Sequence, residues 1–120
     1  MADDLFLVFS NPVSGREDEF NEWYDHQHLG DVLAVPGVAA ARRYDLVPAA
    51  LPEAEGVPAP PPPAHSFLAV YELDGDPDDV LAEFLRRVGS GEMALSDSLD
   101  LSSIALSAWR ARGPRRHTDG

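Results

Sequence analysis

His28 is the residue of this sequence best suited to chemistry, and Tyr24 and Asp31 lie close to it along the chain. An imidazole titrates near neutral pH and acts as a general acid or base when a carboxylate orients it, which Asp31 can do from three residues away. Tyr24 lies one helical turn earlier, where its hydroxyl can donate to a substrate carbonyl or phenolate. Two other interpretations stay open. His28 can be a structural histidine bonded to a backbone carbonyl at the Gly30 bend, and Tyr24 can be a core aromatic residue.

Four more residues lie on or just after predicted strands and are candidates for lining a ligand pocket: Asn11, Arg43, Tyr71 and Trp109. Arg43 can bind an anionic or enolic oxygen. A salt bridge to a neighbouring acid is the commoner role of a strand arginine, and packing is the commoner role of Tyr71 and Trp109. The set is therefore a hypothesis about a pocket whose substrate the sequence leaves open.

The same segment holds five side chains that can bind a metal ion: Glu22, Asp25, His26, His28 and Asp31. Only Glu22 and His26, at positions i and i+4, share a helix face at a spacing that suits a metal. No spacing typical of a zinc protease or of a facial triad occurs, and no glycine-rich loop that could hold a nucleotide phosphate. We therefore expect a solvated acidic helix face, no metal and no cofactor.

The composition excludes several further classes of function. The chain has 120 residues with 21 acidic and 9 basic side chains, a net charge of −12, no cysteine, and arginine as every basic residue. Schiff-base lysines and thiolate nucleophiles are thus absent. An acidic chain is a poor partner for nucleic acid or an anionic membrane. The apolar run at 5–9 is too short for a signal or membrane segment, so we expect a cytoplasmic protein.

Apolar runs and amphipathic segments alternate along the chain, which predicts strands at 5–9, 38–47, 66–73 and 103–112, and helices at 16–28 and 77–88. In the first helix, Phe20, Trp23, Tyr24 and Gln27 have the spacing of one helical face. Gly30 weakens this helix, and a second short turn follows at 32–35. Residues 48–64 contain seven prolines and are predicted to form an extended surface loop.

The order βαββαβ predicts an α+β protein with the ferredoxin-like arrangement, a four-stranded antiparallel sheet with both helices on one face. The first strand, LFLVF, does not alternate with polar residues, so the other face should also be covered. A second copy of the chain is the simplest cover, which predicts a homodimer. We assign residues 1–113 to one domain, with the proline-rich hairpin loop at 48–64 and a flexible tail at 114–120.

Residues 20–38 resemble the dimeric α/β-barrel superfamily, in particular its EthD-like and REDY-like members. Those proteins carry the pattern W-Y-x-x-x-H-L-P-D, a Pro-Gly bend, and a strand containing Arg and Tyr. The matching positions are Trp23-Tyr24, His28-Leu29, Asp31, Pro36-Gly37 and Arg43-Tyr44, while Gly30 replaces the usual proline. The looser pattern extends over most of the chain outside the proline-rich loop.

The resemblance implies a homodimer whose sheets face each other, with a pocket between sheet and helices in each protomer. Relatives include cofactor-independent monooxygenases, cyclases, isomerases and decarboxylases. We therefore expect a cofactor-independent enzyme acting on a small apolar or aromatic metabolite that bears oxygen, by proton-transfer-driven cyclisation, condensation or isomerisation, or by oxygenation. Two alternatives are a non-catalytic binding or accessory protein with the same pocket, and an interaction module that presents the proline-rich loop.

Overall fold

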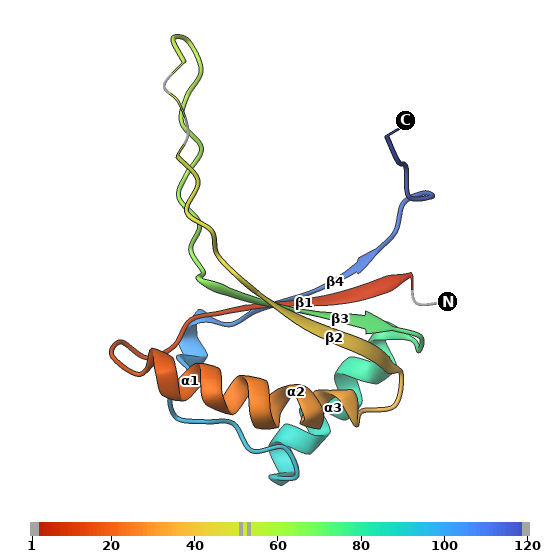
Figure 1. The fold of residues 1–120 in the computed structure, drawn as a ribbon. Helices are drawn as coiled ribbons and strands as arrows, with labels where there is room; N and C mark the ends of the chain where they lie inside the picture. Colours follow the sequence, from red (N-terminus) through yellow and green to blue (C-terminus); the bar gives the residue numbers. More distant parts are fainter. Residues whose placement is uncertain (1–2, 51, 53, 119–120) are drawn as a thin grey trace.

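Four antiparallel strands form one sheet in the order β2-β3-β1-β4, and the helices cover one face of it (Figure 1). The structure is a computed structural model that describes residues 3–50, 52 and 54–118. The strands are β1 (Asp4–Ser10), β2 (Val38–Asp45), β3 (Phe67–Leu73) and β4 (Ala105–Arg110). The predicted ferredoxin-like order is confirmed. The one-domain assignment stays a prediction, and positions 1, 2, 51, 53, 119 and 120 lie outside the described residues.

The first helix is continuous and has three parts: α1 (Glu17–Trp23), a π-helical turn (Tyr24–His28) and α2 (Leu29–Leu33). The predicted break at Gly30 is wrong, because the helix passes through that residue. Its exposed position leaves the helix unstrained, with no heavy atom within 4 Å of where a Cβ would lie. The irregularity instead lies one turn earlier, in the π-helical turn.

The second long helix, α3 (Pro77–Ser90), begins at the predicted residue and ends two residues after the predicted end at 88. The Asp76 carboxylate accepts hydrogen bonds from the backbone N–H groups of Asp78 and Asp79, at 2.8 and 3.4 Å, and so caps the helix. Gly91 ends it in the left-handed conformation, with φ of 84°. Among the described residues, no helix is long and apolar enough to cross a membrane.

Two glycines allow α3 to sit against the start of β2. The carbonyl oxygen of Gly37 accepts hydrogen bonds from the N–H groups of Asp74 and Gly75, at 2.9 and 3.3 Å. Gly37 has φ of 96°, and a Cβ on it would lie 2.6 Å from a methyl carbon of Val80. The close approach therefore needs glycine at position 37.

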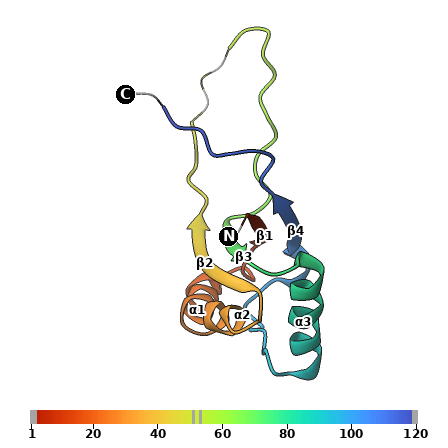
Figure 2. The same ribbon diagram turned by 90° about the vertical axis from the view of Figure 1, so that its right-hand side faces the viewer.

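The two faces of the sheet differ in what covers them. The face toward the helices carries the core residues Phe6, Phe67, Ala69, Tyr71 and Leu73. Strand alternation places Leu5, Leu7, Phe9, Leu68 and Val70 on the opposite face, which we call the outer face. No helix lies over the outer face in either view of the described chain (Figures 1 and 2).

The described part of residues 48–64, which we call the proline arm, projects from the sheet on the side of the outer face (Figures 1 and 2). A β-turn closes the tip, where the N–H of Val57 donates to the carbonyl of Ala54 at 3.1 Å and Gly56 has φ of 79°. The predicted extended loop is thus a hairpin-like arm. The C-terminal segment after β4 rises on the same side, from the opposite end of the sheet.

Candidate functional site

The π-helical turn gathers three aromatic rings beneath the sheet. The ring centroids of Trp23 and His28 lie 4.5 Å apart with planes at 23°, which is a stacked pair. The Tyr24 ring meets His28 edge-on, at 4.9 Å and 89°. Single π turns inside α-helices are often found at functional sites. This turn is therefore the natural centre of a candidate site.

The π turn follows from the spacing of the buried residues. Phe20, Tyr24, His28 and Val32 are all buried and lie four residues apart. In a regular α-helix of 3.6 residues per turn, positions four apart drift by about 40° per step, so the last would leave the core-facing side. The π turn holds one residue more than an α-helical turn, so the four residues stay on the core-facing side. Gln27, which α-helical spacing predicted on this face, is exposed, so that prediction is wrong.

His28 is buried and incompletely hydrogen-bonded. Its side chain belongs to a residue that is 5% exposed, and its Nδ1 atom has no hydrogen-bond partner among the described residues. Burial, and to a smaller extent the nearby positive charge of Arg43, lower the pKa of His28 to about 4. His28 is therefore neutral at physiological pH, with a nitrogen free to accept or donate.

Two tyrosines belong to the same cluster, since the Tyr24 ring contacts the imidazole and the Tyr24 hydroxyl faces that of Tyr71. The Oη atoms of Tyr24 and Tyr71 are 3.5 Å apart, at the limit of a hydrogen bond, and either can be the donor. Burial raises the pKa of both phenols above the ordinary value, and the contact between the hydroxyls raises that of Tyr71 further. Both tyrosines are thus neutral donors at any physiological pH, and they come from different elements, the helix and β3.

Arg43 on β2 lies across this cluster. Its guanidinium carbon sits 4.3 Å from the ring centroid of Tyr24, a cation–π contact. Its Nη1 donates to Asp25 at 2.8 Å and its Nη2 to Asn21 at 2.9 Å. The salt bridge to a neighbouring acid, which the sequence left open, is therefore present. The buried Nε has no partner among the described residues.

An apolar cavity lies next to the cluster, between the sheet, α2 and α3. Its volume is about 10 Å³, close to that of a single water-sized sphere, and its wall is entirely apolar apart from Tyr71. The lining residues are Phe6, Val8, Val32, Val35, Val38, Tyr71, Val80, Phe84 and Leu106. Phe84 also contacts the His28 ring, with centroids 6.4 Å apart, so one side chain touches both the imidazole and the cavity.

The structure brings together four of the seven residues proposed from the sequence, His28, Tyr24, Tyr71 and Arg43. Trp23 and Phe84, which complete the cluster, were not proposed for it. In an α-helix, an aromatic residue five positions before a histidine is not expected to contact it, so the spacing did not predict this pair. Phe84 was visible only as one member of the apolar stripe of its helix.

The other three proposed residues lie elsewhere. Asp31 is half-buried, and no hydrogen bond joins its carboxylate to His28 in the described chain. Asn11 fastens the root of the proline arm: its Nδ2 donates to the Ala64 carbonyl at 2.9 Å and its Oδ1 accepts from the Ser66 N–H at 2.7 Å. Trp109 pairs with Leu5 on the outer face and is 58% exposed.

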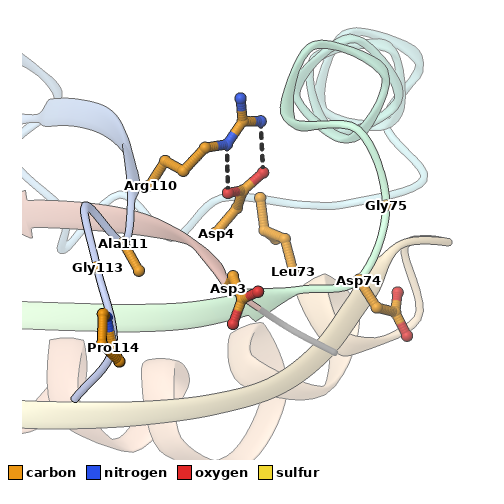
Figure 3. A pocket seen from close by; sticks show the side chains of 9 residues that line it. All are labelled: Asp3, Asp4, Leu73, Asp74, Gly75, Arg110, Ala111, Gly113 and Pro114. Carbon is orange, nitrogen blue, oxygen red and sulfur yellow. Dashed lines mark hydrogen bonds and ion pairs between the residues drawn. The ribbon is translucent and has the colours of Figure 1, made fainter.

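A more open pocket lies at the end of the sheet where β1 and β4 meet the loop before α3 (Figure 3). Its main feature is the paired contact of Arg110 with Asp4, in which Nε and Nη2 each donate to a carboxylate oxygen at 2.8 Å. It contains none of the residues proposed from the sequence. No cluster of three or more His, Asp or Glu side chains suited to a metal occurs within the described part of the chain.

The same fold occurs in known crystal structures. An EthD family protein from Bacillus halodurans is 15% identical with a TM-score of 0.56, over 90% of this chain and 96% of that one. An EthD-like protein from Ralstonia eutropha is also 15% identical, with a TM-score of 0.57 over 96% and 97% of the two chains. No family model matches the sequence, and no curated protein gives a significant match. The chain therefore has the α+β, ferredoxin-like fold of the EthD family proteins.

Proposed function

We propose that this protein is an EthD-like homodimer that binds a small, largely apolar molecule bearing a carbonyl or phenolic oxygen between its sheet and helices, and moves a proton on it without a cofactor. The observation that carries the proposal is the buried His28 with its unpartnered Nδ1. Its ring contacts Tyr24, whose hydroxyl faces that of Tyr71, and Phe84, which lines an apolar cavity. A buried polar atom without a partner costs free energy, so its persistence favours a functional role.

The protonation states fix the direction of the first step. Because the pKa of His28 is about 4, the imidazole is unprotonated at neutral pH and begins as a base. It takes a proton from a carbon next to the ligand's carbonyl, and the electron pair moves to the carbonyl oxygen as an enolate. The hydroxyl of Tyr71 or Tyr24 donates a hydrogen bond to that oxygen. The imidazolium then returns its proton to another atom, which completes an isomerisation or a cyclisation.

The size of the cavity constrains how a ligand enters. A space of about 10 Å³ holds no organic molecule, so Phe84 must move aside before a ligand can reach His28. Packing around α3 allows such a movement, because Val80 is the only residue of this helix that is fully buried. An apolar or aromatic ligand would replace the contacts that the Phe84 ring makes now.

The second candidate function is binding without chemistry, as a carrier or an accessory protein of a pathway. The observation that favours it is the absence of any hydrogen bond from Asp31 to His28 among the described residues, since a catalytic imidazole is usually oriented by such a partner. The two candidates differ in one respect. A carrier has affinity but no turnover to lose when His28 is replaced.

The outer face supports the homodimer. It is apolar along β1 and β3 and carries one residue of each charge, Arg42 and Glu72, which make no ion pair with any described residue. An interface between two identical copies must be complementary to itself, and one positive and one negative side chain on an apolar surface meet that condition. A face-to-face pair of sheets is the arrangement that buries it.

Native mass spectrometry of protein purified without added ligand is the first test. We expect a dimer of twice 13.0 kDa that carries an organic adduct, whose mass then identifies the ligand to use with variants. The His28→Gln variant should keep the dimer and bind the ligand, but lose its turnover. Gln27→Glu, at an exposed neighbouring position, serves as the matched control. A monomer at all concentrations would exclude the homodimer, and unchanged turnover in a folded His28→Gln protein would exclude the proton-transfer role.

A further inference from the structure

The proline arm presents an apolar surface that nothing in the described chain covers. Val47 is 79% exposed and Val57 is 65% exposed, and Leu46 at the arm's root is also exposed. Exposed prolines and alanines make up much of the rest of the described arm. Exposed aliphatic side chains that gather on one projecting segment are typical of an interaction site.

The root of the arm is anchored on the sheet. The two side-chain hydrogen bonds of Asn11 reach its second leg, and the His65 ring nitrogen Nε2 is 2.7 Å from the carbonyl oxygen of Ser103. The first leg is joined to the second by the bond from the Leu46 N–H to the Ser66 carbonyl, at 2.8 Å. Because prolines fix φ and favour an extended chain, the second leg, which holds Pro58 and the run 60–63, is stiff. A rigid arm loses little entropy when a partner binds it.

An apolar groove joins the root of the arm to the outer face. Its wall is mostly apolar and combines arm and root residues with residues of the sheet: Phe9, Tyr44, Asp45, Leu46, Val47, Pro63, Ala64, His65, Ser66, Phe67 and Leu68. Phe9, Tyr44 and Leu68 belong to the outer face itself. The arm and the outer face are therefore one continuous surface, and a molecule that covers the sheet also reaches the arm.

At the other end of the sheet, the segment 111–118, which we call the basic tail, rises on the same side as the arm (Figures 1 and 2). Arg110, just before it, is engaged by Asp4 (Figure 3). Arg112, Arg115 and Arg116 are exposed and make no ion pair with any described residue. On a chain of net charge −12, they form a separate positive group.

We propose that the proline arm and the basic tail of each copy clasp a second copy of this chain, the arm packing on the partner's surface and the tail meeting its acidic residues. The proposal rests on the homodimer proposed above. An occupant must fit between arm and tail, be apolar where it meets the sheet, and be acidic where it meets the tail. A second copy satisfies all three conditions. A domain that binds proline-rich peptides would account for a contact with the arm alone.

Sedimentation equilibrium over a dilution series tests the clasp with two variants. One replaces residues 49–62 by a two-residue Asn-Gly turn, and the other combines Arg112→Gln, Arg115→Gln and Arg116→Gln. Because burial of one large aliphatic side chain already corresponds to about tenfold in a dissociation constant, we expect at least that loss of dimer affinity for the shortened arm. The arginine variant should weaken the dimer and flatten its dependence on salt. Circular dichroism confirms that both variants fold.

Each outcome bears on a different claim. A wild-type protein that is monomeric throughout would overturn the homodimer and the clasp together. A wild-type dimer whose affinity is unchanged by the shortened arm would overturn the clasp and leave the face-to-face dimer intact. A dimer that is insensitive to the shortened arm and instead binds a proline-rich-peptide-binding domain through it would assign the arm to another partner.

A spin label gives a second readout, because the chain has no cysteine and any introduced one is unique. A label on Val57→Cys at the arm tip should be immobilised in the dimer and become mobile on dilution. A label on Glu22→Cys, on the exposed side of α1, should not respond to dilution. Equal mobility of the Val57 label in monomer and dimer would show that the arm makes no contact with the partner.

Discussion

The rings of Trp23 and His28 stack with centroids 4.5 Å apart although four residues lie between them in the chain. In a regular α-helix, two positions five apart point about 140° away from each other around the axis and cannot touch. In the π-helical turn Tyr24–His28 each residue advances by a smaller angle, which brings the two side chains to the same side of the helix. The π-helical turn therefore both allows the stack and keeps the imidazole on the core-facing side of the helix.

If one surplus residue causes the π turn, deleting it should leave a regular helix. Removal of exposed Gln27 would give the four buried positions of this face the spacing i, i+4, i+7 and i+11, which an α-helix satisfies. We expect an unfolding free energy within about 1 kcal/mol of the wild type, measured by urea titration. Insertion of an alanine after Gln27 is the control, and it should cost more than about 2 kcal/mol because Val32 is turned out of the core. A deletion as costly as the insertion would contradict this account.

Stability should depend on pH through His28. The pKa is about 4 in the folded protein and near 6.5 in the unfolded chain, so the unfolded chain takes up the proton first as the pH falls. The contribution of the neutral imidazole is complete above about pH 6.5 and is lost between there and pH 4. The loss amounts to about 3 kcal/mol. Urea titrations from pH 4 to 7 measure it.

The substitution His28→Gln should flatten that profile between pH 4 and 6.5, while His26→Gln, which alters an exposed side chain, should reproduce the wild-type curve. A direct readout is the titration of the His28 ring protons by NMR. A midpoint near 6.5 in the folded protein would show that the imidazole is hydrated and not buried.

Two glycine substitutions should act in opposite directions. Gly37→Ala places a Cβ 2.6 Å from Val80 at a φ of 96°, so we expect a loss of about 2 kcal/mol or more. Gly30→Ala meets no atom within 4 Å inside a helix and should stabilise by up to about 1 kcal/mol. Thermal unfolding of the two variants side by side tests both. Equal effects would mean that α3 does not depend on the close approach at Gly37.

Shortening Phe84 should turn the closed apolar cavity into a binding site. Phe84→Ala should cost about 3 kcal/mol and create space beside His28 for benzene or xenon. Either ligand should then raise the Tm of the variant, since it binds the folded state alone, and leave the wild type unchanged. Leu85→Ala, on the exposed side of the same helix, is the matched control. Equal ligand shifts in all three proteins would refute the gating role of Phe84.

The order of elements was predictable from the sequence because it depends on patterns of a few residues. The run LFLVF and the capped start at Asp76-Pro77 mark β1 and α3 to within one or two residues. Irregularities that interrupt the alternation of a strand or the repeat of a helix were not predictable from the repeating pattern itself. A bulge between Val38 and Ala40 puts Val38 on the same face as Arg43, although the two are an odd number of positions, five, apart.

The candidate site was predictable in part for the same reason. His28 and Tyr24 share a face at a spacing of four, which holds in either kind of helix. The stack with Trp23 needs the π turn, and its one signal was the regular spacing of four from Phe20 to Val32. Asn11 illustrates another limit, because its role depends on hydrogen bonds to residues more than fifty positions away, which no local pattern contains.

The fastening of the arm by Asn11 also has a consequence for how this chain can change. The root is anchored on the strands, so the length and sequence of residues between Leu46 and Ala64 are mechanically separate from the ring cluster under the sheet. The arm can therefore be lengthened, shortened or given a different tip sequence while the ring cluster around His28 keeps its arrangement.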